Sequence, residues 1–474
     1  MSRSNLSPRS SVLATAAAAV AFGLALVWLW VCLCTFPLRS WNDIRLAPAF
    51  APKLGLSIYP GADGPASTWM YGPLPVWLNW PSTLAPGPGE ALLVAGVNNI
   101  LVTLLPILAV AWLWPTGSLA SPGPAGRIVA AAVAIAAMPW ATWQFLQADN
   151  FAIGCGLVAN LILVRGRAEP ARWAAAVFAT AALACKQTSL AIPLAQVVWL
   201  WLTMGRKAAA AHIGRLMVTG LAWLAVILLA CGPGKLWYTA ILTPAGLPWT
   251  DHPSQRFMQM LPHFVVHALV PLALWFWLWR GGSAGHTAIL LPLLTWLLAW
   301  PLGLSSVFKI GGTNNCLQGY PLFLPVGGVV AVAALARRFD RSWAVAVVAA
   351  VAAAILVARV ATREINVWRP HVEVYDEAVA LSRRLPGMLW FPWNPLVTIY
   401  SEGRLYPVED GLYVKQVTGR PEPEAQTRSH LPSRFAAIVL AGTGSEWGLA
   451  SPFLPPPVER VDFEHWTLTR RAKP

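Results

Sequence analysis

Residues 11–35, with the sequence SVLATAAAAVAFGLALVWLWVCLCT, decide the fold class of this chain. The run follows Arg3 and Arg9 and contains no charged residue. A signal peptide has an apolar segment of roughly 7–15 residues, and this run is much longer. A membrane-spanning helix needs about 20 consecutive, mostly apolar residues. The run therefore predicts a first transmembrane helix that is retained in the protein.

The composition indicates that lipid surrounds much of the remaining chain. The 474 residues are 57% hydrophobic and only 11% charged, whereas a soluble domain carries roughly 25% charged residues. The formal net charge is +14, but Lys and Arg separate apolar runs instead of gathering on one soluble face. A nucleic-acid-binding function therefore has no support. The six cysteines are scattered without a CxxC pair, so ordinary thiols are expected.

Further apolar segments predict additional spans. Single spans are expected approximately at residues 91–114, 216–232, 262–279, 287–304, 316–336 and 342–360. Two longer stretches, 128–164 and 173–203, are interrupted by Gln147-Ala148-Asp149-Asn150 and by Lys186-Gln187-Thr188. Arg127, Arg165, Arg172 and Arg206 flank these stretches. Because positively charged ends stay inside, each long stretch is expected to be a hairpin of two short helices with its polar tip outside.

This pattern predicts about eleven transmembrane helices, with the N-terminus in the cytoplasm and the C-terminus outside it. Residues 1–360 then form a transmembrane module with a large outer loop at 36–90. Residues 361–474 are charged and mixed in composition, which predicts a small extracytoplasmic α/β domain. Within that domain, residues 388–391, 396–400 and 435–440 are expected to be strands and residues 375–384 a helix. A bacterial inner membrane is the expected location.

The first outer loop carries the strongest signal for chemistry. It begins with Trp41-Asn42-Asp43-Ile44-Arg45, continues through Ile58-Tyr59-Pro60, and closes with Tyr71-Gly72-Pro73-Leu74-Pro75. A carboxylate in a partly desolvated cleft acquires a raised pKa and becomes a usable general base. Asp43 could also cap a juxtamembrane helix or pair with Arg45, and the spacing leaves these alternatives open.

An Asp after the first helix, followed by IYPG and YGPLP, resembles the first outer loop of GT-C glycosyltransferases. These membrane enzymes take a sugar from a polyprenyl-phosphate donor, and they include protein O-mannosyltransferases and aminoarabinose transferases. Asp149 in QADN, Lys186 in CKQTS and Asn315 in KIGGTNNCLQGYP also fit this pattern. The resemblance covers most of residues 1–360 as loose patterns. It departs from many relatives at Asn42, which stands before a lone Asp43 where they have paired acids.

The resemblance implies a GT-C-like fold, with Asp43 and Asp149 as the catalytic carboxylates. The residues expected to bind substrate are Arg45, Tyr59, Tyr71, Lys186, Gln187, Lys309, Asn314 and Asn315. The resemblance assigns no metal ligand and no cofactor, and it leaves a divalent cation as an open alternative. The implied partners are a polyprenyl-phosphate sugar and a glycan, lipid or protein acceptor.

Several of these residues have a second interpretation. Lys186 could bind the donor phosphate or form an ion pair with Asp149. Lys309 could extend to the membrane interface, and Asn314 and Asn315 could cap a helix. The rival function is a multi-pass transporter or lipid flippase of cell-envelope biosynthesis. Transporters often show repeat symmetry and charges near the membrane midplane, whereas here the polar features are expected to gather on one face.

Overall fold

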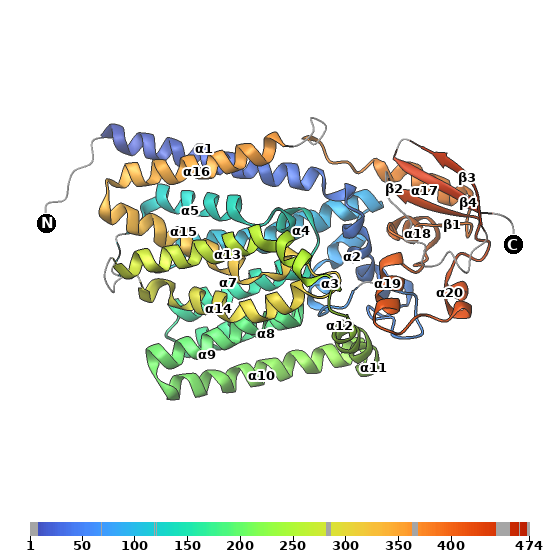
Figure 1. The fold of residues 1–474 in the computed structure, drawn as a ribbon, viewed down its shortest axis with the longest axis horizontal. Helices are drawn as coiled ribbons and strands as arrows, with labels where there is room; N and C mark the ends of the chain where they lie inside the picture. Colours follow the sequence, from blue (N-terminus) through green and yellow to red (C-terminus); the bar gives the residue numbers. More distant parts are fainter. Residues whose placement is uncertain are drawn as a thin grey trace.

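The computed structural model describes residues 8–67, 69–117, 119, 121–280, 286–362, 368–441, 456–463 and 465–471. Its helices form an elongated bundle, and the C-terminal elements lie at the end opposite the N-terminus (Figure 1). The bundle helices are α1 (Pro8–Cys34), α4 (Pro88–Leu113), α5 (Gly123–Ala137), α7 (Ala148–Arg165), α8 (Glu169–Cys185), α9 (Ala191–Met204), α10 (Arg206–Cys231), α13 (Pro253–Arg280), α14 (His286–Val307), α15 (Gly319–Arg338) and α16 (Arg341–Ala361).

Every apolar segment singled out in the sequence forms one of these helices. In the described part of the chain, eight helices are long and apolar enough to cross a membrane, and α5 is a shorter apolar helix. The two long stretches are both broken. α8 and α9 are separated by residues 186–190, as predicted, whereas α5 and α7 are separated by residues 138–147, so that the predicted interruption at 147–150 falls mostly in the first turn of α7. The fold is thus a polytopic α-helical membrane bundle, and the total of eleven spans stays a prediction.

Small residues allow the bundle helices to pack closely. Ala130, Ala132 and Ala134 of α5 are fully buried. A Cβ atom at Gly154 of α7 would lie 2.1 Å from the carbonyl oxygen of Val102 in α4. Close approach between helix backbones is typical of membrane bundles, where van der Waals packing takes over from the hydrophobic effect as the main source of helix association.

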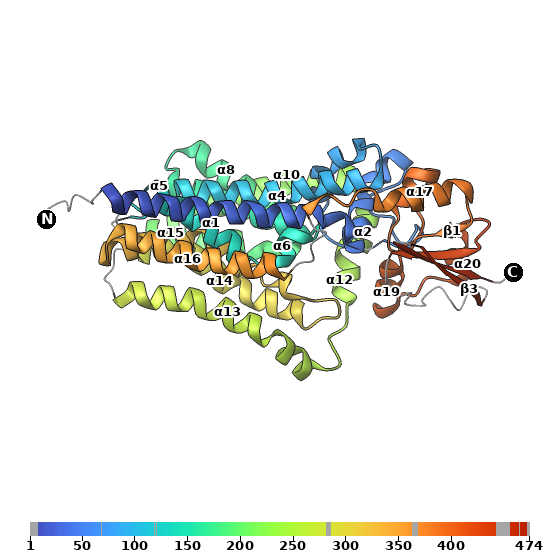
Figure 2. The same ribbon diagram turned by 90° about the horizontal axis from the view of Figure 1, so that it is seen from above.

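The connecting segments between the bundle and the C-terminal elements form a layer of short helices (Figures 1 and 2). From the first loop come η1 (Phe36–Leu38), α2 (Ser40–Phe50), η2 (Ala51–Leu54), α3 (Leu74–Leu78) and η3 (Trp80–Leu84). Later segments add α6 (Trp140–Gln144), η4 (Gln187–Leu190), α11 (Pro233–Leu236), η5 (Trp237–Leu242), α12 (Thr243–Gly246) and η6 (Asn314–Cys316). The polar tips and the two long loops thus share one end of the bundle. α13 begins at Pro253 and so extends further toward this end than the predicted span at 262–279.

The C-terminal elements combine helices with one small mixed sheet. The helices are α17 (Val374–Arg384), α18 (Leu396–Glu402), α19 (Glu409–Val417) and α20 (Glu424–His430), and the strands are β1 (Leu389–Trp390), β2 (Ala437–Ala441), β3 (Pro457–Asp462) and β4 (Trp466–Arg471). The strand order is β1-β2-β4-β3; β1 pairs parallel with β2, and the other pairs are antiparallel. This confirms the small α/β arrangement.

One strand prediction in this region is wrong. Residues 396–400 have the β-favouring sequence LVTIY, yet they form helix α18. Pro395 precedes the helix, and the Asp43 carboxylate accepts a hydrogen bond of 2.9 Å from the backbone N–H of Leu396. An anionic acceptor at a helix N-terminus stabilises the first turn. This distant contact outweighs the local preference for a strand.

The first loop packs directly against the C-terminal elements. Ile44 of α2 and Ala66 are buried in one apolar cluster with Trp390 and Leu412. The N–H of Val408 donates to the carbonyl of Ala66 over 2.9 Å. A domain division at residue 360 therefore stays a prediction, and the two parts share an extensive boundary.

We predict that Gly411→Ala weakens this boundary. An added Cβ would lie 2.6 Å from the backbone nitrogen of Ser67, so α19 must shift away from the loop. Overpacking of this kind costs about 1–3 kcal/mol, which will lower the melting temperature measured in detergent. Gly214→Ala is the matched control because its Cβ would meet nothing within 4 Å. Equal melting temperatures for the two variants would contradict the close packing.

Candidate functional site

A buried ion pair lies where three bundle helices end. The Lys186 Nζ atom lies 2.7 and 2.8 Å from the two carboxylate oxygens of Asp149. Asp149 is 2% exposed and Lys186 4%, so both charges are removed from solvent. The ion pair expected as one alternative for Lys186 is therefore present, and binding of a donor phosphate by Lys186 stays a prediction.

Helix geometry explains how these residues meet. Asp149 is in the first turn of α7, and Lys186 directly follows the last residue of α8. These two helices are packed against each other and joined at their other ends by residues 166–168. The partial charges of helix ends favour an anion at an N-terminus and a cation at a C-terminus. The break at 186–188 and the start at 148–149 therefore place opposite charges side by side.

Two amide side chains complete the surroundings of Asp149. The Gln318 Nε2 atom donates to Asp149 over 2.6 Å, and the Asn315 Nδ2 atom donates over 3.3 Å. Gln318 directly precedes α15, and its Oε1 atom accepts from the Ser189 hydroxyl over 3.2 Å. Gln318 and Ser189 lie within the quoted motifs KIGGTNNCLQGYP and CKQTS, but they were not named as site residues. The predicted span at 316–336 included Gln318, whereas helix α15 begins after it, at Gly319.

The first loop covers this centre with an aromatic ring. The Lys186 Nζ atom lies 5.3 Å from the centroid of the Tyr71 ring, within range of a cation–π interaction. The Tyr59 hydroxyl donates to the carbonyl of Tyr71, and the N–H of Gly72 donates to the carbonyl of Cys185 over 3.1 Å. A Cβ at Gly72 would lie 1.9 Å from the carbonyl oxygen of Ala184. Only glycine permits the loop to lie this close to the end of α8.

Two of the other predicted residues, Gln187 and Lys309, bind backbone groups. The Gln187 side chain donates to the carbonyls of Met70 and Ala240, over 3.1 and 2.8 Å. Lys309 donates to the carbonyl of Pro244 over 3.1 Å. Asn315 belongs to η6, and its side chain also contacts Thr313. Asn314 is in the same turn, but its side chain lies outside the described part of the structure.

Asp43 lies against the C-terminal elements. Its carboxylate is fully buried and accepts hydrogen bonds from the N–H of Leu396, at 2.9 Å, and from Asn394, at 3.3 Å. Burial raises the pKa of Asp43 to about 7, although these hydrogen bonds oppose the shift. The preceding Asn42 points into the bundle end and bonds the backbone of Phe36, Gln144 and Leu146.

Arg45 lies near a further carboxyl group that was not singled out in the sequence. Its guanidinium donates to the carbonyl of Leu146 over 3.1 Å and lies 5.1 Å from the Trp41 ring centroid. Asp410, in the first turn of α19, is buried, and this burial raises its pKa to about 7 while the charge of Arg45 partly opposes the rise. Asp410 and Asp43 therefore both titrate near neutral pH.

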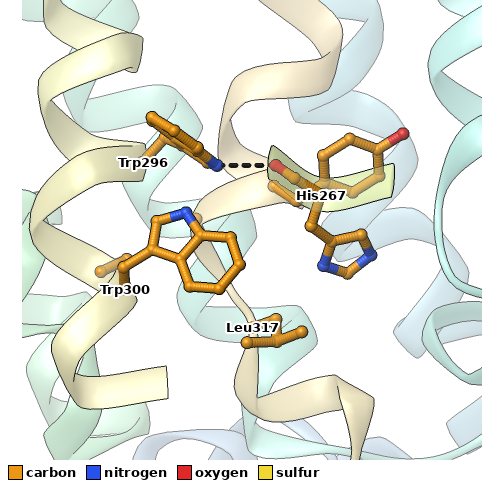
Figure 3. A pocket seen from close by; sticks show the side chains of 7 residues that line it. His267, Trp296, Trp300 and Leu317 are labelled. Carbon is orange, nitrogen blue, oxygen red and sulfur yellow. Dashed lines mark hydrogen bonds between the residues drawn. The ribbon is translucent and has the colours of Figure 1, made fainter. Parts of the chain in front are cut away.

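A small hollow elsewhere in the bundle does not contain these residues. Figure 3 shows it between α13, α14 and the start of α15, bordered by His267, Trp296, Trp300 and Leu317. His267 stacks on Tyr320 with ring centroids 4.2 Å apart, and the free volume of about 10 Å³ suits at most a single water molecule. Among the described residues, no three His, Cys, Asp or Glu side chains come together to hold a metal ion.

Comparisons with known proteins support the fold. No family model matches the chain, and no curated protein sequence matches it significantly. The crystal structure of ArnT from Cupriavidus metallidurans bound to undecaprenyl phosphate has a TM-score of 0.58 at 13% identity, covering 95% of this chain and 97% of that one. The apo state of the same protein gives 0.57 at 14% identity, with the same coverage. The chain thus shares the fold of this ArnT structure, which is the GT-C-like fold expected from the sequence.

We predict that removing one charge of the Asp149–Lys186 pair destabilises the protein strongly, whereas removing both charges destabilises it far less. Lys186→Met leaves a buried carboxylate without its cation, which costs about 3–5 kcal/mol of unfolding free energy. The double variant Asp149→Asn/Lys186→Met leaves no buried charge and should recover most of that loss. Unfolding in detergent with increasing denaturant measures both changes.

An exposed pair provides the control. Arg428 and Glu424 form a 2.7 Å ion pair on α20 with both side chains about half exposed. Arg428→Met should change the unfolding free energy by less than about 1 kcal/mol. A Lys186→Met variant as stable as Arg428→Met would contradict a buried charge pair at the end of α7 and α8.

Proposed function

We propose that this chain is a multi-pass membrane glycosyltransferase that takes a sugar from a polyprenyl-phosphate donor at the outer face of the membrane. The observation that carries the proposal is the buried Asp149–Lys186 pair at one end of the apolar bundle, covered by Tyr71. The GT-C-like fold adds support, because the ArnT structure of the same fold is bound to undecaprenyl phosphate. A lipid bilayer and a lipid-linked donor are then the natural partners.

Lys186 is suited to bind the phosphate of such a donor. A phosphate group is charged and has several acceptor oxygens, so it can compete with the Asp149 carboxylate for the Lys186 ammonium group. A fixed cation in a water-poor site also stabilises the negative charge that develops on a leaving phosphate. The amide groups of Asn315 and Gln318 already donate hydrogen bonds at this place. When Lys186 pairs with the donor phosphate in place of Asp149, the Asp149 carboxylate loses its cation and can act on the sugar or the acceptor.

The transfer itself requires one bond to form and one to break. The acceptor hydroxyl oxygen forms a bond to the anomeric carbon, and the bond from that carbon to the phosphate oxygen breaks. The hydroxyl proton passes to a carboxylate, and polyprenyl phosphate leaves with the electron pair. Arg45, Tyr59, Tyr71 and Lys309 are proposed to bind the two substrates around this step.

Asp43 is the proposed general base, and its surroundings set a condition on that role. A pKa of about 7 suits a base that works near neutral pH. Asp43 is fully buried against Leu396 and Asn394, so the segment 394–396 has to move before an acceptor hydroxyl can reach this carboxylate. Asp149 is the second proposed catalytic carboxylate; after the exchange at Lys186 it still accepts hydrogen bonds from Gln318 and Asn315.

The remaining features of the proposal follow from topology and chemistry. The N-terminus is placed in the cytoplasm and the C-terminal elements outside it, in a bacterial inner membrane. The sugar is a hexose or pentose, and the acceptor is a lipid, a glycan or a protein. A transporter or lipid flippase is the less favoured alternative, because the charged centre lies at one end of the bundle under a folded loop and not near its middle.

We predict that transfer depends on the Asp149–Lys186 centre. Reconstituted protein is supplied with radiolabelled undecaprenyl-phosphate sugars, and label moving to acceptor or to water is measured. The double variant Asp149→Asn/Lys186→Met should lower turnover by at least about 100-fold while it stays folded. Wild-type turnover in this variant would overturn the proposed site, and no turnover with any donor in the wild type would overturn the proposed function.

A control variant has to distinguish two roles of Asp43: general base in the transfer, or a residue that only holds the C-terminal elements in place. We expect Asp43→Asn to abolish transfer because an amide cannot accept the acceptor proton. Asn394→Ala removes the hydrogen bond to Asp43 over 3.3 Å but leaves the carboxylate in place. This variant should keep transfer and lose only stability. Equal losses of activity in the two variants would show that Asp43 acts only by holding the C-terminal elements.

We predict a pH profile that reports Asp43. A general base must be unprotonated, so kcat/KM should rise about tenfold per pH unit below 7 and level off above it. Asp410→Asn is the control because Asp410 has a similarly raised pKa of about 7. If that substitution removes the rise between pH 5 and about 7, the titrating group is Asp410 and not Asp43.

A further inference from the structure

The outer side of the first loop borders a hollow of about 310 Å³. Its walls come from the end of α2 and from η2, from residues 57–67, from α11 and from the C-terminal segment before α19. The lining includes Pro48, Leu56, Ser57, Asp63, Lys235 and Leu405. None of these residues belongs to the Asp149–Lys186 centre or was proposed above to bind substrate.

The hollow has the size and lining of a site for a sugar ring. Ligand sites are typically about 300–1,000 Å³, so this one is at the small end and suits a compact group and not a long lipid chain. Ser57 and Ser67 offer hydroxyl groups, and Asp63 and Lys235 offer one charge of each sign. Pro48, Leu56 and Leu405 offer apolar surface for the C–H faces of a ring.

A single layer of chain separates this hollow from the ion pair. Ser57, Ile58 and Pro60 line the hollow, whereas Tyr59 between them donates its hydroxyl to the carbonyl of Tyr71. Tyr71 in turn lies over Lys186. A group bound in the hollow is therefore one loop thickness away from a donor phosphate at Lys186, so Tyr59 and Tyr71 have to move aside before its hydroxyl can reach the donor sugar.

The C-terminal elements hold the rim of the hollow in place. Gln426 donates to the carbonyl of Ala62 over 2.7 Å, and Lys415 donates to the same carbonyl over 3.3 Å. Lys415 is itself fixed by a 2.9 Å ion pair with Glu422, whose side chain is 2% exposed. A rim that is held from outside needs little ordering when a ligand binds, which favours affinity.

We propose that this hollow is the acceptor subsite and that it binds a terminal sugar ring of a glycan or glycolipid acceptor. The inference rests on the proposed glycosyltransferase function. It names the acceptor as a carbohydrate, and it gives the C-terminal elements the role of shaping the acceptor subsite through residues 62–66.

The test fills the hollow and removes its cation separately. Ser57→Phe places a ring in the space, and Lys235→Ala removes the charge. Lys207→Ala is the matched control, since Lys207 is exposed in the first turn of α10, at the other end of that helix from Lys235. The acceptors are a panel of p-nitrophenyl glycosides, and the donor is the undecaprenyl-phosphate sugar that the wild type consumes.

We expect Ser57→Phe to raise the KM for the glycoside by about tenfold or more and Lys235→Ala to raise it less. The KM for the donor should stay unchanged in both, and Lys207→Ala should behave like the wild type. A raised donor KM with an unchanged glycoside KM would overturn the proposal by assigning the hollow to the donor sugar. Unchanged values for both substrates would overturn it as well.

A binding experiment separates this inference from the proposed function. Saturation-transfer NMR of the same glycosides with the protein in nanodiscs should give signals for the wild type and Lys207→Ala that Ser57→Phe loses. This result would support a sugar site even if the wild type consumes no polyprenyl-phosphate sugar. Glycoside signals that persist in Ser57→Phe, or no signal in the wild type, would place no sugar in the hollow.

Discussion

The ion pair between Asp149 and Lys186 is the interaction on which the membrane half of the structure depends. An unpaired charge buried at the end of an apolar bundle has a large desolvation free energy, so the two charges are stable there only as a pair. The pair fixes where α7 begins and where α8 ends, and Gln318 brings the start of α15 to the same point. Three helix ends thereby meet at the Asp149 carboxylate.

The first loop packs against both the ion-pair end of the bundle and the C-terminal elements. On its inner side, Gly72 lies against the end of α8, and on its outer side Ser67 lies against Gly411 of α19. Both contacts are too close for a Cβ atom, so glycine at each place sets how near the loop can lie. The ion pair, the loop and the C-terminal elements therefore form consecutive layers, and a shift in one has to be accommodated by the next.

The sequence predicted the parts of this arrangement that depend on local composition. Apolar length and the placement of Arg127, Arg165, Arg172 and Arg206 located the helices and the two interruptions. The pairing of Asp149 with Lys186 was one of two alternatives, since charge alone does not choose between a partner and a ligand. The surroundings of Asp43 could not be predicted, because its partners lie 351 and 353 residues further along the chain. The same distant contact turned a strand-like sequence into α18.

These sequence separations have a consequence for biosynthesis. Ribosomes deliver the first loop to the membrane hundreds of residues before α18, α19 and α20 exist, and contacts between such distant segments form late. During that interval α2 lacks the partners of its buried carboxylate, and residues 62–66 lack the side chains that hold them. The membrane helices can insert one after another, but the loop acquires its final shape only after residues 394–426 have emerged.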